Sequence, residues 1–418
     1  MTKTNSNKHT PTKHTCSLWQ ICVAGVAVLG VVVSVEVWWW WWWCVPNTTT
    51  TMTLIKSGMY QMGGEEEGRG RGKNELLFQE EEEEEEEEMP VKGYTFPNCD
   101  CIRFGVDIAR MAVEARSQWR GEESQWGGSG EVRSLLHPLN TSGHSTCSDF
   151  ATQRGGGQKV IAYSYYSTEA TTDSGSTHYK KYLGSLHKQA RRIAKAYPGF
   201  LMRVYHNVSA TDDTATAFLC RLVCTHAHVD LCDVTRLPVL GNLVRQGVVG
   251  RAWRFAVLGD PTVDLFLSRD SDSWLLDREV AAVQEWLSSD LTFHVMRDHP
   301  NHKAVMLAGL WGGINKRPKK FAAVRNVMFS QPTNLTRKYD QYLLATFLWP
   351  LIKNDTLQHD SYTCTLTTHL GSIPFPTKRE EDLYCGCGPY KSRERFVLSR
   401  SKCPHACRPT QHQSWTLC

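Results

Sequence analysis

The feature that most constrains the fold of this chain is a regular alternation of apolar, strand-like runs with amphipathic helical segments, which begins near residue 159. Residues 159–164 and 200–206 read as buried strands. Between them, aromatic and aliphatic residues recur at helical spacing until Pro198-Gly199 ends the helix. Repeated strand–helix–strand units predict an α/β fold, in which a mixed, mainly parallel sheet is flanked by helices.

The rest of this region continues the alternation. Further strands are predicted at 229–234, from 263, near 293 and near 307, and helical segments at 212–226, 253–255, 277–288 and 339–352. The glycine run at 155–157 precedes the first strand instead of following it, and the sequence has no Walker loop. Dinucleotide-dependent oxidoreductases and P-loop transferases are therefore disfavoured.

The apolar strand that starts at residue 263 stops abruptly at the sequence RDSDS, residues 269–273. Side chains alternate along an extended backbone, so Asp270 and Asp272 are expected to point the same way and to share one divalent cation. The carboxyl edge of an α/β sheet is where such folds bind ligands, so the pair suits a metal–diphosphate site. A solvated polar turn is the alternative.

The first 45 residues predict a membrane anchor. Residues 1–16 carry lysines and no acidic residue, and residues 17–45 form an almost uninterrupted apolar run with six tryptophans, 38–43, near its end. This length spans a bilayer, tryptophan suits the membrane interface, and the positive flank predicts a cytoplasmic N-terminus. We therefore expect a single-pass type II membrane protein, with a cleaved signal peptide as the alternative.

The chain beyond this span has features of an oxidising, extracytoplasmic compartment. Twelve of the 15 cysteines lie there, and so do all five N-x-S/T sequences, at Asn47, Asn140, Asn207, Asn334 and Asn354. Residues 46–157 are rich in Thr, Gly and Glu and include nine consecutive glutamates, which predict a solvated, disordered, low-complexity stem. A net charge of +4 is too small to indicate nucleic-acid binding.

Several local motifs resemble one family. SRDSDS at 268–273, DREVAAVQEWL at 277–287, FHVMRDHPNH at 293–302 and LAGLWGG at 307–313 are similar to motifs of GT-A-fold, DXD-type glycosyltransferases, and in particular of largely uncharacterised bacterial and invertebrate glycosyltransferase-like domains. The resemblance covers residues 158–377, and a cysteine-rich tail, 378–418, is additional. It implies a GT-A-like catalytic domain in the Golgi lumen that takes a nucleotide-diphosphate sugar as donor and a glycan or glycoconjugate as acceptor.

The resemblance also implies the ligands of a metal. Asp270 and Asp272 would supply carboxylate oxygens, and His359 lies where several members of the family supply an imidazole. A surface histidine in a polar turn is the alternative for His359. Such ligands suit Mn²⁺ or Mg²⁺, which would act as a Lewis acid on the leaving diphosphate.

The candidate substrate-binding residues combine cations, which pair with diphosphate, with aromatic and small residues, which contact a sugar. They are Tyr163, Arg254, Arg269, Arg297, Trp311, Gly312, Gly313 and Gln341. By resemblance, Arg254 matches the arginine-bearing helix ahead of the DXD motif, and Gln341 matches part of a downstream Asp-Gln pair. Structural arginines and a core tryptophan are the alternatives.

Three residues are candidates for catalysis. Asp298 and His299 follow a predicted strand, and either could act as a general base if the reaction inverts, although a salt-bridged loop is the alternative. Asp340 could instead contact the sugar, and a retaining reaction would then need no deprotonated base. The stereochemical outcome stays open.

Two other interpretations compete with a glycosyltransferase. The domain could belong to a non-catalytic membrane glycoprotein that binds glycans or scaffolds partners. The tail could hold zinc through Cys385, Cys387, Cys403 and Cys407, but an oxidising lumen favours disulfides and the spacing matches no common zinc finger. We therefore expect the tail cysteines, Cys418 included, to be oxidised.

Overall fold

The computed structural model describes residues 94–95, 99, 101–103, 143–166 and 179–418. These residues belong to one compact unit that spans 86–418. The predicted cytoplasmic tail and membrane anchor, 1–45, lie outside the described residues, as does most of the predicted stem. Within the described ranges, no helix is both long and apolar enough to cross a membrane.

The core of the molecule is a seven-stranded sheet in the order β5-β4-β3-β6-β8-β7-β9. The strands are β3 (Gln158–Tyr165), β4 (Phe200–His206), β5 (Val229–Asp233), β6 (Val263–Arg269), β7 (Phe293–Arg297), β8 (Leu310–Ile314) and β9 (Thr356–Asp360). Neighbouring strands are parallel except where β8 runs antiparallel between β6 and β7. The predicted α/β class with a mixed, mainly parallel sheet is confirmed.

The strand order contains a topological switch. From β3 the chain builds outward through β4 to β5, and it then crosses to the other side of β3 to form β6. The carboxyl ends of β3 and β6 therefore lie next to each other at the point where the strand order reverses, which we call the switch point. Open α/β sheets bind their ligands at this position.

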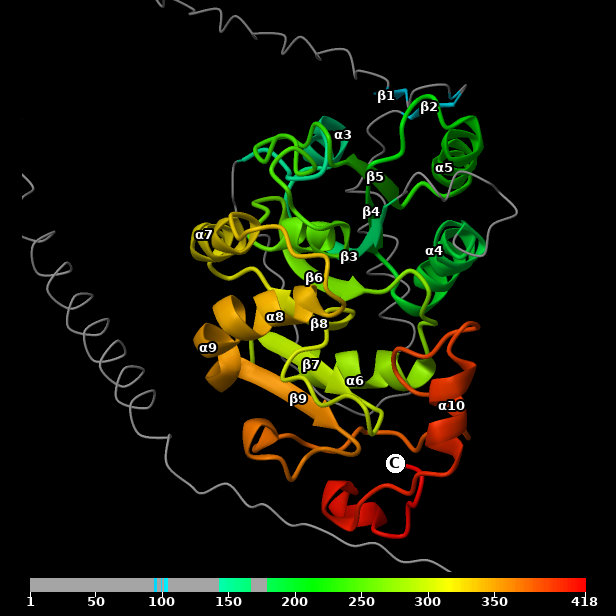
Figure 1. Cartoon of the computed structure of the whole chain (residues 1–418), viewed down its shortest axis with the longest axis vertical. Coiled ribbons are helices and arrows are strands. Elements are labelled where there is room, and N and C mark those ends of the chain that lie inside the picture. The colour runs from blue at the N-terminus through cyan, green and yellow to red at the C-terminus, as the bar shows by residue number, and fades with distance from the viewer. Residues whose placement is uncertain (1–93, 96–98, 100, 104–142, 167–178) are drawn as a thin grey trace, which may run out of the picture. The chain divides into compact units, whose positions relative to one another are not determined.

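Helices cover both faces of the sheet (Figure 1). On one face lie α4 (Leu186–Ala196), α5 (Asp213–Thr225) and α6 (Asp277–Leu287). On the other lie the 3₁₀ helix η3 (Gly250–Val257), α7 (Pro318–Phe329), α8 (Tyr339–Leu343), the π-helical turn η4 (Leu344–Leu348) and α9 (Trp349–Ile352). Local sequence sets several helix starts: the Asp212 side chain caps α5, and Pro318 opens α7.

Some elements differ from the sequence-based expectation. The strand expected near 307 begins at Leu310, and neither α7 nor β9 was predicted. The helix expected at 339–352 is divided into α8, η4 and α9. Pro350 lies at the start of α9 and has no N–H to donate to the preceding turn, which explains why the helical hydrogen-bond pattern changes there.

Residues 143–157, which the sequence assigned to the stem, pack against the core. Ser148 caps the short helix α3 (Asp149–Gln153), and Cys147 is bonded to Cys232 on β5. The buried Asp260 carboxylate accepts hydrogen bonds from both Ser145 and Thr146, and Arg203 neutralises its charge at 2.7 Å. This segment is therefore part of the folded domain.

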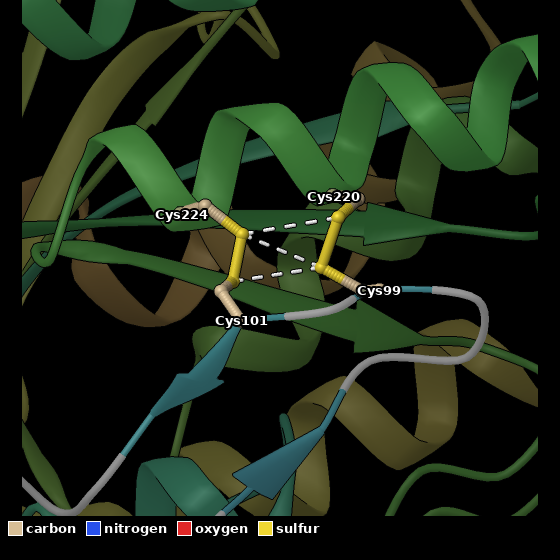
Figure 2. Close-up of side chains that lie close together, drawn as sticks. All are labelled: Cys99, Cys101, Cys220 and Cys224. Carbon is tan, nitrogen blue, oxygen red and sulfur yellow. Dashed lines mark hydrogen bonds between the residues drawn. A yellow bond between two sulfur atoms is a disulfide. The ribbon is translucent and has the colours of Figure 1, made fainter.

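A pair of disulfides lies at the surface of α5. Cys99 is bonded to Cys220 and Cys101 to Cys224, and all four sulfur atoms lie within 4.8 Å of one another (Figure 2). These bonds tie the hairpin of β1 (Tyr94–Thr95) and β2 (Ile102–Arg103) to the helix.

The C-terminal tail, which includes α10 (Ser392–Ser399), is also cross-linked, as predicted for its cysteines. Disulfides join Cys364 to Cys407 and Cys403 to Cys418. The expected oxidation of Cys385 and Cys387 is wrong, because both are free thiols that are buried in two different apolar clusters. Five disulfides among the described residues indicate an oxidising, extracytoplasmic compartment.

Candidate functional site

The structure brings four of the predicted site residues together at the carboxyl end of β6: Arg254, Asp270, Asp340 and Gln341. Arg254, on η3, donates from Nη1 to Oδ1 of Asp270 at 2.6 Å and from Nη2 to Oδ2 of Asp340 at 3.3 Å. Its backbone N–H donates to Ser164 near the end of β3, which fixes η3 against the carboxyl ends of β3 and β6. Gln341 is next to Asp340, and its N–H donates to the second oxygen of that carboxylate.

The two carboxylates that share Arg254 differ in their electrostatics. Burial opposes ionisation of Asp270, but the charges of Arg254 and Lys391 hold its pKa below the usual range. Burial dominates at Asp340 and raises its pKa, although Arg254 acts in the opposite direction. Asp270 is therefore the firmly ionised member of the pair, and Asp340 is the one closer to accepting a proton.

Asp272 has different partners. Lys181, on η2 (Tyr179–Leu183), lies 3.2 Å from its Oδ2, and Lys391, in the tail, lies 3.3 Å from its Oδ1. The Lys391 ammonium also donates to Ser273 Oγ at 2.7 Å and to the Gly386 carbonyl at 2.8 Å. The loop after β6 is therefore held from both sides by positive charge.

The residues at this edge fit a hard divalent cation. The Asp270 side chain is 41% exposed, and Arg254 contacts its Oδ1. A Cβ on Gly309 would lie only 2.5 Å from this carboxylate, so glycine preserves the space beside it. Mg²⁺ is commonly bound by one or two carboxylates together with substrate phosphates, and Asp270 keeps an accessible carboxylate for that role. Residues 270–273 form a turn in which the Ser273 N–H donates to the Asp270 carbonyl at 3.1 Å, so the extended backbone expected to point both aspartates the same way is not observed.

The structure does not bring His359 to the two aspartates. It lies on β9, three strands from β6, which is about 14 Å at the usual strand spacing. Its ring nitrogens lie 2.8 Å from Nε2 of His294 and 2.9 Å from a carboxylate oxygen of Glu285. Burial lowers the pKa of His359, which favours the neutral ring. With both nitrogens engaged at a distant strand, this residue does not suit the metal role expected of it.

Asp298 and His299 are held in a hydrogen-bond network below the surface. Arg278 binds both oxygens of Asp298 at 2.9 Å, and Ser361 and the Cys385 N–H donate to them as well. Both ring nitrogens of His299 are engaged by backbone groups. Neither residue has the free lone pair that a general base needs, so the geometry favours the salt-bridged alternative.

Arg269 and Arg297 are buried and paired inside the protein. The Arg269 guanidinium contacts Glu279 at 2.6 Å, and the Arg297 guanidinium contacts Asp360 at 2.7 Å. Both are 1% exposed. Their charge is neutralised by internal carboxylates, so the geometry favours structural arginines over diphosphate ligands.

The predicted aromatic and glycine contacts with a sugar are core positions. Trp311 is fully buried and packs edge-on against two phenylalanine rings at 5.1 and 5.8 Å. A Cβ on Gly312 or Gly313 would lie 2.6 or 2.7 Å from atoms of the neighbouring strands, so these glycines allow close strand packing. Tyr163 is fully buried in the cluster under α4 and α6.

Four residues near the carboxyl ends of β3 and β6 were not predicted from the sequence. They are Tyr166, Lys181, Gly309 and Lys391. Tyr166 directly follows β3 and packs edge-on against Trp253, and its place at a strand end was a readable signal. Gly309 lies in the LAGLWGG motif, whereas nothing in the local sequence marks Lys181 or Lys391.

No protein-family model and no curated protein matches the chain. Among solved structures, a glycosyltransferase involved in the glycosylation of the major capsid of PBCV-1 matches with 14% identity and a TM-score of 0.29, over 49% of this chain and 83% of that one. The 4-diphosphocytidyl-2C-methyl-D-erythritol synthase of Anaerococcus prevotii matches with 8% identity and a TM-score of 0.28, over 45% and 81%.

Proposed function

We propose that the chain is a glycosyltransferase that moves a sugar from a nucleotide-diphosphate sugar to a glycan, protein or lipid acceptor in the lumen of the secretory pathway. One observation carries this proposal. Two carboxylates one residue apart follow β6 beside the topological switch of the sheet, and the buried Arg254 ties the first of them to Asp340. This is where an α/β sheet of this order binds a nucleotide.

The residues at the switch point would have different roles in binding a donor. Asp270 and Asp272 would hold Mn²⁺ or Mg²⁺, which stabilises the negative charge that develops on the leaving diphosphate. The Arg254 fork fixes the direction of the Asp270 carboxylate and adds positive charge beside the phosphates. Tyr166, at the end of β3, is half-buried and offers an aromatic face next to Arg254.

Asp340 is the candidate for contact with the sugar or the acceptor hydroxyl. Of the three residues considered for catalysis, it is the one at the β6 edge, and burial raises its pKa toward the range in which a carboxylate accepts a proton. Arg254 holds one of its oxygens and the Gln341 N–H the other. These contacts orient the carboxylate and hold it at the carboxyl end of β6.

The test is release of free nucleotide by the full-length protein incubated with a panel of nucleotide sugars and Mn²⁺. We expect release with at least one donor, and loss of release when EDTA removes the metal. Asp272→Asn keeps the shape of the side chain and removes its charge, so turnover should fall by about 100-fold or more while the fold is retained. Absence of release from the whole panel would instead support a non-catalytic, glycan-binding or scaffolding domain.

A further inference from the structure

Asp272 is neutralised by two lysines from distant parts of the chain, one on η2 and one in the tail. We propose that Lys181 and Lys391 are exchangeable counterions: they neutralise Asp272 in the metal-free protein and bind the diphosphate of the donor when a divalent cation takes the carboxylate. This inference rests on the proposed function and assigns the tail a direct part in donor binding.

The geometry shows that metal and lysines compete for the same carboxylate. Each oxygen of Asp272 faces one ammonium group, at 3.2 and 3.3 Å, and the aspartate side chain is only 8% exposed. A divalent cation binds a carboxylate oxygen at about 2.1 Å and repels an ammonium group that is already there. Binding of the cation therefore requires at least one lysine to leave.

Both lysines are able to move. Their side chains are 25% and 20% exposed, and the four-carbon stem of lysine is flexible. Lys391 must also give up its hydrogen bonds to Ser273 and Gly386. The aspartate, in contrast, is fixed in the loop after β6. The exchange thus needs no rearrangement of the backbone.

The balance of charge indicates where the lysines go. The ion pairs at this edge join three acids to three cations: Asp270, Asp272 and Asp340 to Arg254, Lys181 and Lys391. A divalent cation on Asp272 displaces at least one ammonium group from a carboxylate that is only 8% exposed, and unpaired charge there is costly. The diphosphate that arrives with the metal is the anion within reach, so the two lysines are matched to it in number and sign.

The position of Lys391 is set by the backbone of the tail. The Trp274 N–H donates to the Cys387 carbonyl at 2.7 Å, and a Cβ on Gly388 would overlap the Asp272 carbonyl oxygen. The tail therefore lies directly on the loop that bears the aspartates. The competing explanation is that Lys391 only fastens the tail there, through Ser273 and Gly386.

The test is to measure Mn²⁺ binding to the full-length protein by electron paramagnetic resonance, and then the affinity for inorganic pyrophosphate at saturating Mn²⁺. Lys181→Gln and Lys391→Gln keep hydrogen-bonding groups and remove the charge, and Lys402→Gln, an exposed position in the tail, is the matched control. Exchange predicts that each site variant binds Mn²⁺ about two- to fivefold more tightly and pyrophosphate about tenfold more weakly. The control should match the wild type in both.

If the lysines exchange partners, their removal should increase the affinity for Mn²⁺ and decrease the affinity for pyrophosphate. Mn²⁺ affinity that is unchanged or weaker in both lysine variants would overturn the exchange, and so would unchanged pyrophosphate affinity. An Mn²⁺ affinity of the wild type that does not depend on Asp272, tested with Asp272→Asn, would instead overturn the proposed metal site itself. The two failures are therefore distinguishable.

Discussion

Two groups of charged residues lie at the carboxyl edge of the same sheet, one after β6 and the other after β7 and β9, and they differ in how their charges are neutralised. After β7 and β9, Asp298 and Asp360 are fully buried, and arginines and neighbouring donors engage them. After β6, the carboxylate of Asp270 is 41% exposed, and Asp272 is held by two lysines whose side chains are 25% and 20% exposed. The first group resembles the interior of a protein, and the second has the open geometry of a binding site.

This difference teaches how to interpret charged motifs at strand ends. A buried carboxylate whose oxygens are all engaged contributes to the fold, because breaking its pair would leave an uncompensated charge. A carboxylate that keeps an accessible oxygen, as Asp270 does, can take a ligand directly. A carboxylate whose partners are partly exposed lysines, as for Asp272, can exchange them for a ligand. We therefore assign the β7–β9 group to stability and the β6 group to function, and each prediction below tests one side of that division.

The largest effect on stability is expected at Asp298. Asp298→Asn leaves the Arg278 guanidinium buried without its bidentate carboxylate, which should lower the free energy of unfolding by about 3–5 kcal/mol. Urea denaturation of the full-length protein measures this. Asp272→Asn is the matched control and should cost about 1 kcal/mol or less, because its lysine partners are partly exposed. Equal losses in both variants would remove the distinction between the groups.

A pH effect on stability should come from His294 and His359. Burial lowers the pKa of both rings, so the unfolded chain binds more protons than the folded one below about pH 6.5. Their contribution to stability is therefore present above that pH and is lost as the pH falls. The melting temperature should decrease between pH 7.5 and 5, and His359→Gln should reduce the slope. A melting temperature that rises on acidification would show that these rings are charged in the fold.

Of the variants designed to destabilise the fold, Trp311→Phe should have the smallest effect. Its ring is packed in the core, and its Nε1 has no hydrogen-bond partner among the described residues, so Trp311→Phe removes volume without stranding a polar partner. We expect a loss of about 1–2 kcal/mol in the free energy of unfolding and an unchanged KM for the donor. A raised KM with unchanged stability would return this residue to the sugar platform that the sequence suggested.

The sequence predicted the parts of the fold that depend on local periodicity. The strand expected at 200–206 is β4 in full, and the helix expected at 277–288 is α6 to within one residue. Periodicity could not place β8 between β6 and β7, because strand order depends on contacts between distant segments. It also could not show that Pro350 divides the last helix, since the apolar pattern continues through it.

The candidate site was predictable where charged residues of a known motif follow the end of a predicted strand. Asp270, Asp272, Arg254 and Asp340 were identified by motif and order, and the structure brings the last two together with Asp270. Asp298 also follows the end of a strand, as Asp270 does, and His359 lies near the end of β9. Only the residues packed against Asp298 and His359 show that they do not belong to the site. Lys391 could not be found from the sequence, because the tail reaches the β6 loop across 118 residues of chain from Ser273.

The division between the two groups is tested most directly by measuring nucleotide release per folded molecule for Asp270→Asn and Asp298→Asn, at a temperature low enough that both variants remain folded. We predict that Asp270→Asn loses release by about 100-fold or more and melts at a higher temperature than Asp298→Asn, because Arg254 keeps Asp340 as a partner. Asp298→Asn should melt at a clearly lower temperature and release nucleotide at close to the wild-type rate. The reverse outcome, in which folded Asp298→Asn is inactive and Asp270→Asn is active, would contradict the account and place the chemistry after β7.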